Sequence, residues 1–187
     1  MLFDFGPYPV SQMKALSGRQ KAIEEIGAFA EGLTHAPDVR DGSAVLAFEV
    51  RNPTLFTPRL MAHLRSGGIR PVMGLNAGMP GLQRQMRALA VCDATDPLDP
   101  NWCLAGPLIV RWHCSGPLSP PFVQEPERKR AGDPVTRTLI ASLVMRAVRS
   151  GVPAYVLAGD DAEGDAPRTL LDILASLDAM RAADRRF

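Results

Sequence analysis

Short, nearly continuous apolar runs alternate along this chain with longer segments whose apolar residues recur at helical spacing. The clearest run covers residues 44–50, AVLAFEV, and lies between the turn-forming pairs Asp41-Gly42 and Asn52-Pro53. A run of this kind is typical of a strand that is buried on both faces of a parallel sheet. Since parallel strands need long crossover connections, this alternation predicts a mainly parallel α/β fold.

Three further runs predict strands at residues 69–73, 108–112 and 154–158, and residues 2–5 are a candidate edge strand. Pro71 weakens the first of these predictions, because proline cannot donate a hydrogen bond to a neighbouring strand. Helical spacing predicts helices over residues 18–33, 57–66, 82–91 and 134–149, and a last helix around 170–177.

The starts of three helices carry capping patterns. Ser17 and Gln20 fit a capping box, in which each side chain satisfies a free backbone donor of the first turn. Thr57-Pro58 and Asp133-Pro134 each place an N-cap residue before a first-turn proline.

The element order predicts a three-layer α/β sandwich of Rossmann-like or flavodoxin-like kind, with helices on both faces of the sheet. The 187 residues form a single domain in this interpretation, with a proline-rich irregular insertion at about 115–133. An eight-fold barrel is excluded because it typically needs about 250 residues.

Composition excludes several classes of protein. Lys and Arg total 21 and Asp and Glu total 20, so the net charge of +1 argues against a dedicated nucleic-acid binder. No apolar run is long enough to cross a membrane, and the first residues lack the features of a signal peptide. We therefore expect a soluble cytoplasmic protein with no membrane partner.

In parallel α/β folds, ligands bind in the crevice outside the carboxyl ends of the strands. Here those ends lead into Arg51-Asn52, residues 74–81, His113-Cys114 and residues 159–165. Arg51 and Asn52 are therefore candidate binding residues, with ordinary loop polarity as the alternative. The sequence leaves the roles of His113 and Cys114 open.

The glycine-rich loop GLNAGMPG, residues 74–81, is the strongest single candidate for a binding site. Gly74, Gly78 and Gly81, together with Asn76, lie between a predicted strand and a predicted helix. Small residues let backbone N–H groups approach a phosphate, and the helix start adds partial positive charge. The spacing matches neither a dinucleotide-binding nor a P-loop motif, so a tight structural turn is the alternative.

Carboxylates gather after the last predicted strand, where Asp160 and Asp161 are candidates to hold ribose hydroxyls or Mg²⁺. The alternative is a solvated loop whose acids stabilise the start of the next helix. The three cysteines lack the paired spacing of a zinc site, so we expect reduced, metal-free thiols.

Two functional hypotheses follow. In the first, the protein binds a small phosphorylated or nucleotide-like ligand, with phosphate on the glycine-rich loop. The sequence identifies neither a cofactor nor a reaction. In the second, the protein is a non-catalytic accessory or assembly subunit that binds another protein through residues 115–133 and Phe122.

Overall fold

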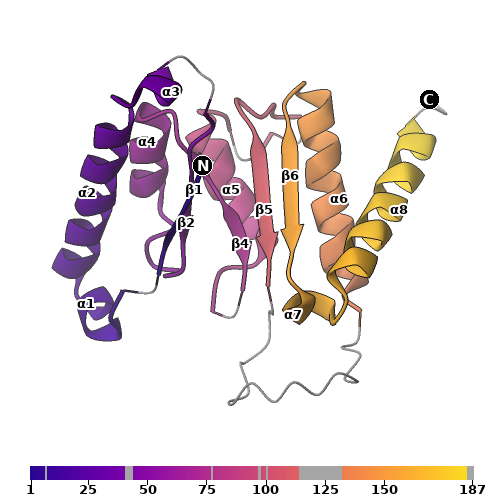
Figure 1. Cartoon of the computed structure of the whole chain (residues 1–187), viewed down its shortest axis with the longest axis horizontal. Helices are drawn as coiled ribbons and strands as arrows, with labels where there is room; N and C mark the ends of the chain where they lie inside the picture. Colours follow the sequence, from indigo (N-terminus) through magenta and orange to yellow (C-terminus); the bar gives the residue numbers. More distant parts are fainter. Residues whose placement is uncertain are drawn as a thin grey trace.

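The structure is a computed structural model that describes residues 1–6, 8–40, 44–76, 78–96, 98–99, 101–113 and 132–184 (Figure 1). The insertion expected at about 115–133 lies outside the described residues except for Gly132 and Asp133, and so does Cys114. None of the described helices is both long and apolar enough to cross a membrane.

Strands and helices alternate in the described chain. The strands are β1 (Leu2–Phe5), β2 (Ala47–Val50), β3 (Arg70–Pro71), β4 (Met73–Leu75), β5 (Leu108–Trp112) and β6 (Ala154–Ala158). The longer helices are α2 (Leu16–Leu33), α4 (Pro58–Ser66), α5 (Leu82–Cys92), α6 (Pro134–Arg149) and α8 (Ala166–Asp184). The short helices are α1 (Val10–Lys14), α3 (Pro37–Arg40) and α7 (Asp160–Glu163).

All strand pairs in the described residues are parallel, in the orders β1-β2-β3 and β4-β5-β6. One stretch, residues 70–75, joins the two ladders. Its first part pairs with β2 (Phe48 opposite Pro71), and its second part pairs with β5 (Met73 opposite Val110). The predicted α/β class, the parallel pairing and the edge strand β1 are thus confirmed, and the strands stand side by side in chain order (Figure 1).

Helices cover one face of these strands through two apolar clusters. At the β1 end, Phe3, Phe5 and Phe48 pack around Phe29 of α2, with ring centroids 4.9–5.8 Å apart. At the other end, β5 contributes Leu108, Val110 and Trp112 to a core shared with α5, α6 and α8. The bulky side chains of the strand interiors therefore hold the helical layer in place.

The opposite face of the strands is different in character. Ala47, Val72 and Ile109 form a small buried cluster there. On the edge strand β6, which pairs in register with β5, Tyr155 is 49% exposed and Leu157 is 46% exposed. Glu49 and Arg111 also lie on this face, which we call the open face. All four residues of β2 are buried, as the sequence predicts for a strand covered on both faces, whereas β6 is exposed on this side.

Several predicted boundaries are wrong. Helix α2 begins at Leu16 with Ala15 as its N-cap and has no side-chain cap, so the capping box at Ser17 does not form. The short helix α1, which the sequence analysis missed, ends at Lys14 and packs against α2. The strand expected over 44–50 is limited to Ala47–Val50.

The strand expected over residues 69–73 divides at Val72 into β3 and β4. Pro71 carries no amide hydrogen, so the chain cannot extend the ladder continuously there. The Val72 N–H still donates to the Phe48 carbonyl oxygen at 2.9 Å. From Met73 onward the chain pairs with β5.

The two predicted N-caps that are followed by a first-turn proline are confirmed. Thr57 Oγ1 accepts a hydrogen bond from the Leu60 amide at 3.3 Å at the start of α4. Asp133 caps α6 by accepting from the Thr136 amide at 2.9 Å.

Replacing Leu143 by alanine tests the core beneath α6. Its side chain is fully buried, so Leu143→Ala should lower the free energy of unfolding by about 2–5 kcal/mol in urea titrations. Val148 lies on the same helix but is 56% exposed, so Val148→Ala should change the free energy of unfolding by less than about 0.5 kcal/mol. Equal losses of unfolding free energy in the two variants would contradict the burial of Leu143 and the exposure of Val148.

Candidate functional site

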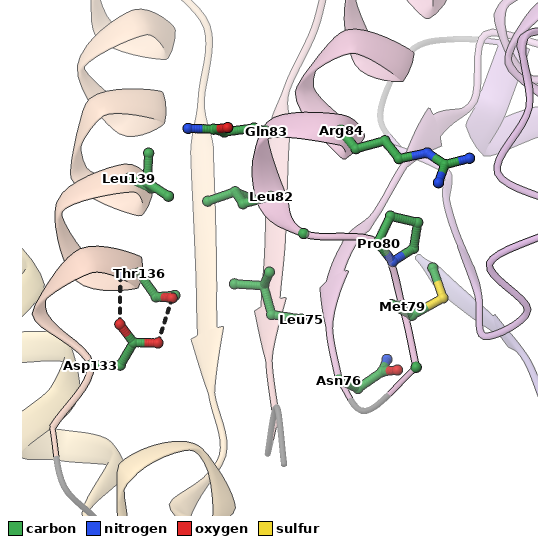
Figure 2. Close-up of a pocket in the computed structure, with 12 residues that line it drawn as sticks. Leu75, Asn76, Met79, Pro80, Leu82, Gln83, Arg84, Asp133, Thr136 and Leu139 are labelled. Atoms are coloured by element: carbon green, nitrogen blue, oxygen red, sulfur yellow. Dashed lines mark hydrogen bonds between the residues drawn. The ribbon is translucent and has the colours of Figure 1, made fainter. Parts of the chain in front are cut away.

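A pocket of about 480 Å³ opens at the carboxyl end of β4 (Figure 2). Its lining comes from the glycine-rich loop, the first turn of α5, and the N-cap and first two turns of α6. These residues are Leu75, Asn76, Gly78, Met79, Pro80, Gly81, Leu82, Gln83, Arg84, Asp133, Thr136 and Leu139. Of the residues predicted to bind a ligand, the structure therefore brings Asn76, Gly78 and Gly81 together.

The glycine-rich loop delivers the start of α5 to this pocket. Gly78 has a φ of +85°, a conformation that favours glycine. Gly81 is the N-cap of α5 and offers no side chain to the first-turn amides, which are the natural donors for an anion.

Gln85 holds the two ends of the loop together. Its buried Nε2 donates to the carbonyl oxygens of Gly74 at 2.8 Å and Pro80 at 2.7 Å. The start of α5 is thereby fixed beside the end of β4, which makes the loop a preorganised turn. The sequence analysis missed this clamp, because a glutamine on a predicted helix gives no sign of its partners.

The opposite wall of the pocket belongs to α6. Both oxygens of Asp133 accept hydrogen bonds from Thr136, from its amide at 2.9 Å and from its hydroxyl at 2.7 Å (Figure 2). Arg84 lies at the other side, where its side chain extends past Pro80 and away from α6 (Figure 2). The pocket thus has a cationic rim and an acidic wall.

A charged network lies on the open face, and none of its residues lines this pocket. Arg111 Nη1 of β5 donates to Glu49 Oε2 of β2 at 2.7 Å and to Asp4 Oδ2 of β1 at 3.2 Å. Arg51 forms a two-point pair with the same Asp4 carboxylate, with Nε to Oδ1 at 3.0 Å. The hydrogen bond to Glu49 is the largest cause that raises the pKa of Arg111 above its ordinary value, and Asp4 adds to it.

Gly74 lies between the strands that the Glu49–Arg111 pair connects. A Cβ at this position would lie 3.1 Å from Glu49 Oε1 and 3.3 Å from Asn76 Nδ2. Glycine therefore leaves the space that the buried carboxylate occupies. Glu49 is fully buried, and among the described residues its Oε1 has no hydrogen-bond partner.

A second glycine, Gly159, makes room for another pair at the end of the neighbouring strand. His113 Nδ1 lies 3.4 Å from Asp161 Oδ1, and a Cβ on Gly159 would lie 3.2 Å from His113 Nδ1 and would overlap Asp161. The His113 Nε2 atom is buried and has no hydrogen-bond partner within the described chain. A carboxylate at Nδ1 fixes the orientation of an imidazole and leaves Nε2 for other contacts.

Two other predicted residues serve the fold in this structure. The side-chain oxygen of Asn52 accepts from the Tyr8 amide at 2.7 Å, which ties the N-terminal segment to the end of β2. Asp160 Oδ1 accepts from the Ala166 amide at 2.9 Å at the start of α8. Neither residue lines the glycine-loop pocket. The helix-start interpretation of the acidic turn therefore accounts for Asp160.

Sequence reasoning did not single out Asp4, Glu49 or Arg111 as members of one cluster. One signal was present, because each charge interrupts a short apolar strand and such charges are rarely buried unless they are paired. Which acid pairs with which arginine depends on the strand order, which the sequence does not display.

Metal ligands do not gather in the described chain, where no group of three or more His, Cys, Asp or Glu side chains could hold an ion. Cys92 is a free buried thiol, and Cys103 is free and exposed. Burial, partly opposed by Arg70, raises the pKa of the Cys92 thiol to about 11.

No protein-family model, curated protein or solved structure matches this chain. What the pocket and the charged network could bind therefore follows from the hydrogen-bonding groups that they present. Free first-turn amides favour an anion, whereas the carboxylates of Glu49 and Asp133 favour groups that donate hydrogen bonds.

The two described thiols should react at very different rates. In a Cys114→Ser variant at pH 8, Cys103 should react promptly with Ellman's reagent, because it is exposed. Cys92 should react only after unfolding in urea, since the raised pKa leaves almost no thiolate and the side chain is buried. Rapid titration of both thiols in the native protein would contradict this placement.

Proposed function

We propose that the protein binds a small phosphorylated or nucleotide-like ligand at the carboxyl edge of its strands. The phosphate would lie on the turn from Gly78 to Leu82. The observation that carries the proposal is the start of α5, which faces a pocket of about 480 Å³ with no side chain capping it.

The chemistry of this turn suits an anion. A Cβ added at Gly78 or at Gly81 would meet no atom within 4 Å, so the space in front of the backbone is open. The unpaired amides and the helix dipole place partial positive charge there. Arg84 is exposed and makes no ion pair with the described residues, so its guanidinium is available to a phosphate at the rim.

Gly74, Asn76, Gly78 and Gly81 are the predicted binding residues that this proposal uses directly. Arg51 contributes to the neighbouring charged network through Asp4, and Asp161 contributes through His113. Asp160 is proposed only as a helix cap. No reaction is assigned to the site.

A second function is favoured by a different observation. Tyr155 and Leu157 are about half exposed on β6, an edge strand of the described sheet. Exposed apolar side chains beside unpaired strand edges are typical of protein interaction surfaces. An accessory subunit would use such a surface, whereas the predicted contact through residues 115–133 lies outside the described chain. Retained partner binding in a protein that binds no phosphate would favour this alternative.

The Rossmann-like or flavodoxin-like three-layer arrangement remains a proposal about the layers. It requires helices on both faces, whereas the described strand order follows the chain order in each ladder. Right-handed crossovers that always step in one direction place their helices on one face. The proposed phosphate turn is independent of a second helical layer, because it lies at the carboxyl end of β4.

Gly81→Asp should separate ligand binding from stability. Aspartate is a good N-cap residue and Gly81 has a φ of −57°, so the melting temperature should stay level or rise. The new carboxylate would occupy the amides and repel an anion, so binding of inorganic phosphate in calorimetric titrations should be lost. Unchanged phosphate affinity in this variant would contradict the proposed turn.

Arg84→Gln should weaken phosphate binding several-fold, since it removes the positive charge at the rim without touching the core. Arg87 is an exposed arginine one turn further along α5 and outside the pocket, so Arg87→Gln is the matched control and should leave affinity unchanged.

Gly78→Val adds a second probe of the turn. It should lower both the melting temperature and the affinity, because its φ of +85° strains a β-branched residue.

A further inference from the structure

Strand β6 ends the row of strands on the side where α6 and α8 lie (Figure 1). The Pro153 carbonyl oxygen accepts a hydrogen bond from β5 and the Gly159 N–H donates one to it, each at 2.9 Å. Backbone groups alternate in direction along a strand, so the outward N–H and C=O groups belong to Ala154, Val156 and Ala158. Within the described residues these groups have no hydrogen-bond partner.

The side chains of this edge are uncharged. Residues 154–158, AYVLA, contain no charge and no proline, and Tyr155 and Leu157 are about half exposed on the open face. The opposite edge strand, β1, carries the ion-paired Asp4 instead. Charges on an edge strand oppose pairing with another chain, so of these two edges β6 is the one suited to pairing.

Apolar surface continues from this edge onto α8, which packs against β6 and α6. Leu170 and Leu177 of α8 belong to the same core as Ala154 and Val156 of β6. Leu174 lies one turn from both leucines and is 54% exposed. A stable interface buries about 800 Å² on each partner, so a strand edge flanked by an apolar helix surface suits a partner better than a strand edge alone.

Two copies of β6 fit each other in one antiparallel register. When the strands pair about Val156, this residue lies opposite Val156 of the second copy, and Ala154 lies opposite Ala158 of the second copy. The residues whose backbone groups point outward then all form hydrogen-bonded pairs. On the open face, Tyr155 lies beside Leu157 of the second copy, so both apolar side chains gain a neighbour.

The charges at the two ends of β6 favour this direction of pairing. The strand begins shortly after the last turn of α6, which carries Arg146 and Arg149, and it leads into Asp160 and Asp161. Antiparallel pairing brings the acidic end of each copy to the basic end of the other. Parallel pairing would place like charges together, which is unfavourable.

We propose that two copies of this chain pair through antiparallel β6 strands and thereby join their sheets into one. The interface is isologous, because a two-fold axis at Val156 relates its halves. This inference does not depend on the phosphate turn. It assigns the exposed β6 surface to a second copy of the chain, whereas the accessory-subunit hypothesis assigns it to a different protein.

Sedimentation of the full chain over a range of concentrations tests this proposal. The wild-type protein should have the mass of two chains at micromolar concentration and should dissociate on dilution. A chain that stays monomeric at its highest soluble concentration would overturn the proposal, whether β6 is then open, covered by another segment of the chain or reserved for a different protein.

Two double variants test the register, because position 155 should face position 157 of the second copy. Tyr155→Lys with Leu157→Lys places like charges opposite each other, so the dissociation constant of the dimer should rise about 100-fold or more. Tyr155→Lys with Leu157→Glu places opposite charges there, so the dissociation constant should stay within about tenfold of the wild-type value. Circular dichroism should show both variants folded, since both side chains are half exposed.

Leu16→Lys is the matched control, because Leu16 is 63% exposed on α2 at the β1 end of the sheet. It should leave the dissociation constant unchanged. A dimer that survives the two lysines, or one that is lost equally in both double variants, would overturn the pairing through β6.

If a double variant fails to fold, hydrogen exchange of the wild-type protein decides. The outward Val156 amide should exchange more slowly as the protein concentration rises through the dissociation constant. Exchange of this amide that is independent of concentration would overturn the proposal.

Discussion

The ion pair between Glu49 and Arg111 links the two strand ladders of this protein, which residues 70–75 also join through the backbone. Glu49 belongs to the ladder β1-β2-β3 and Arg111 to the ladder β4-β5-β6, and the pair crosses the strand between them at Gly74. Burying a carboxylate is unfavourable unless it is paired, so the two ladders must lie where this contact can form. The same requirement keeps residue 74 free of a side chain.

Because this pair lies toward the carboxyl end of the strands, residues near it also hold the glycine-rich loop in place. Gly74 borders the buried carboxylate on the open face, and its carbonyl oxygen accepts from Gln85, which fixes the phosphate turn. The core under the helices is largely apolar but includes the buried Gln85, whereas the opposite face holds the Glu49–Arg111 pair beside the cluster of Ala47, Val72 and Ile109.

The sequence predictions are accurate where a local pattern of residues sets the element and wrong where it does not. Strands β5 and β6 lie at the predicted residues 108–112 and 154–158, because each β-branched and aromatic run begins directly after a proline, Pro107 or Pro153. The caps at Thr57 and Asp133 are local hydrogen bonds within one turn, so they could also be predicted. The capping box at Ser17 does not form because α2 already begins at Leu16, directly after the short helix α1 that the sequence analysis did not predict.

By itself, the sequence determined the α/β class and most of the helices and strands, and it made the glycine-rich loop the leading candidate for a site. These features depend on periodicity and turn chemistry, which act over a few residues. Only the tertiary structure decided that β2 and β5 flank residues 70–75, and therefore that Glu49 meets Arg111 above Gly74. Partners 62 residues apart are set by strand order, and strand order arises from packing of the whole chain rather than from any local pattern.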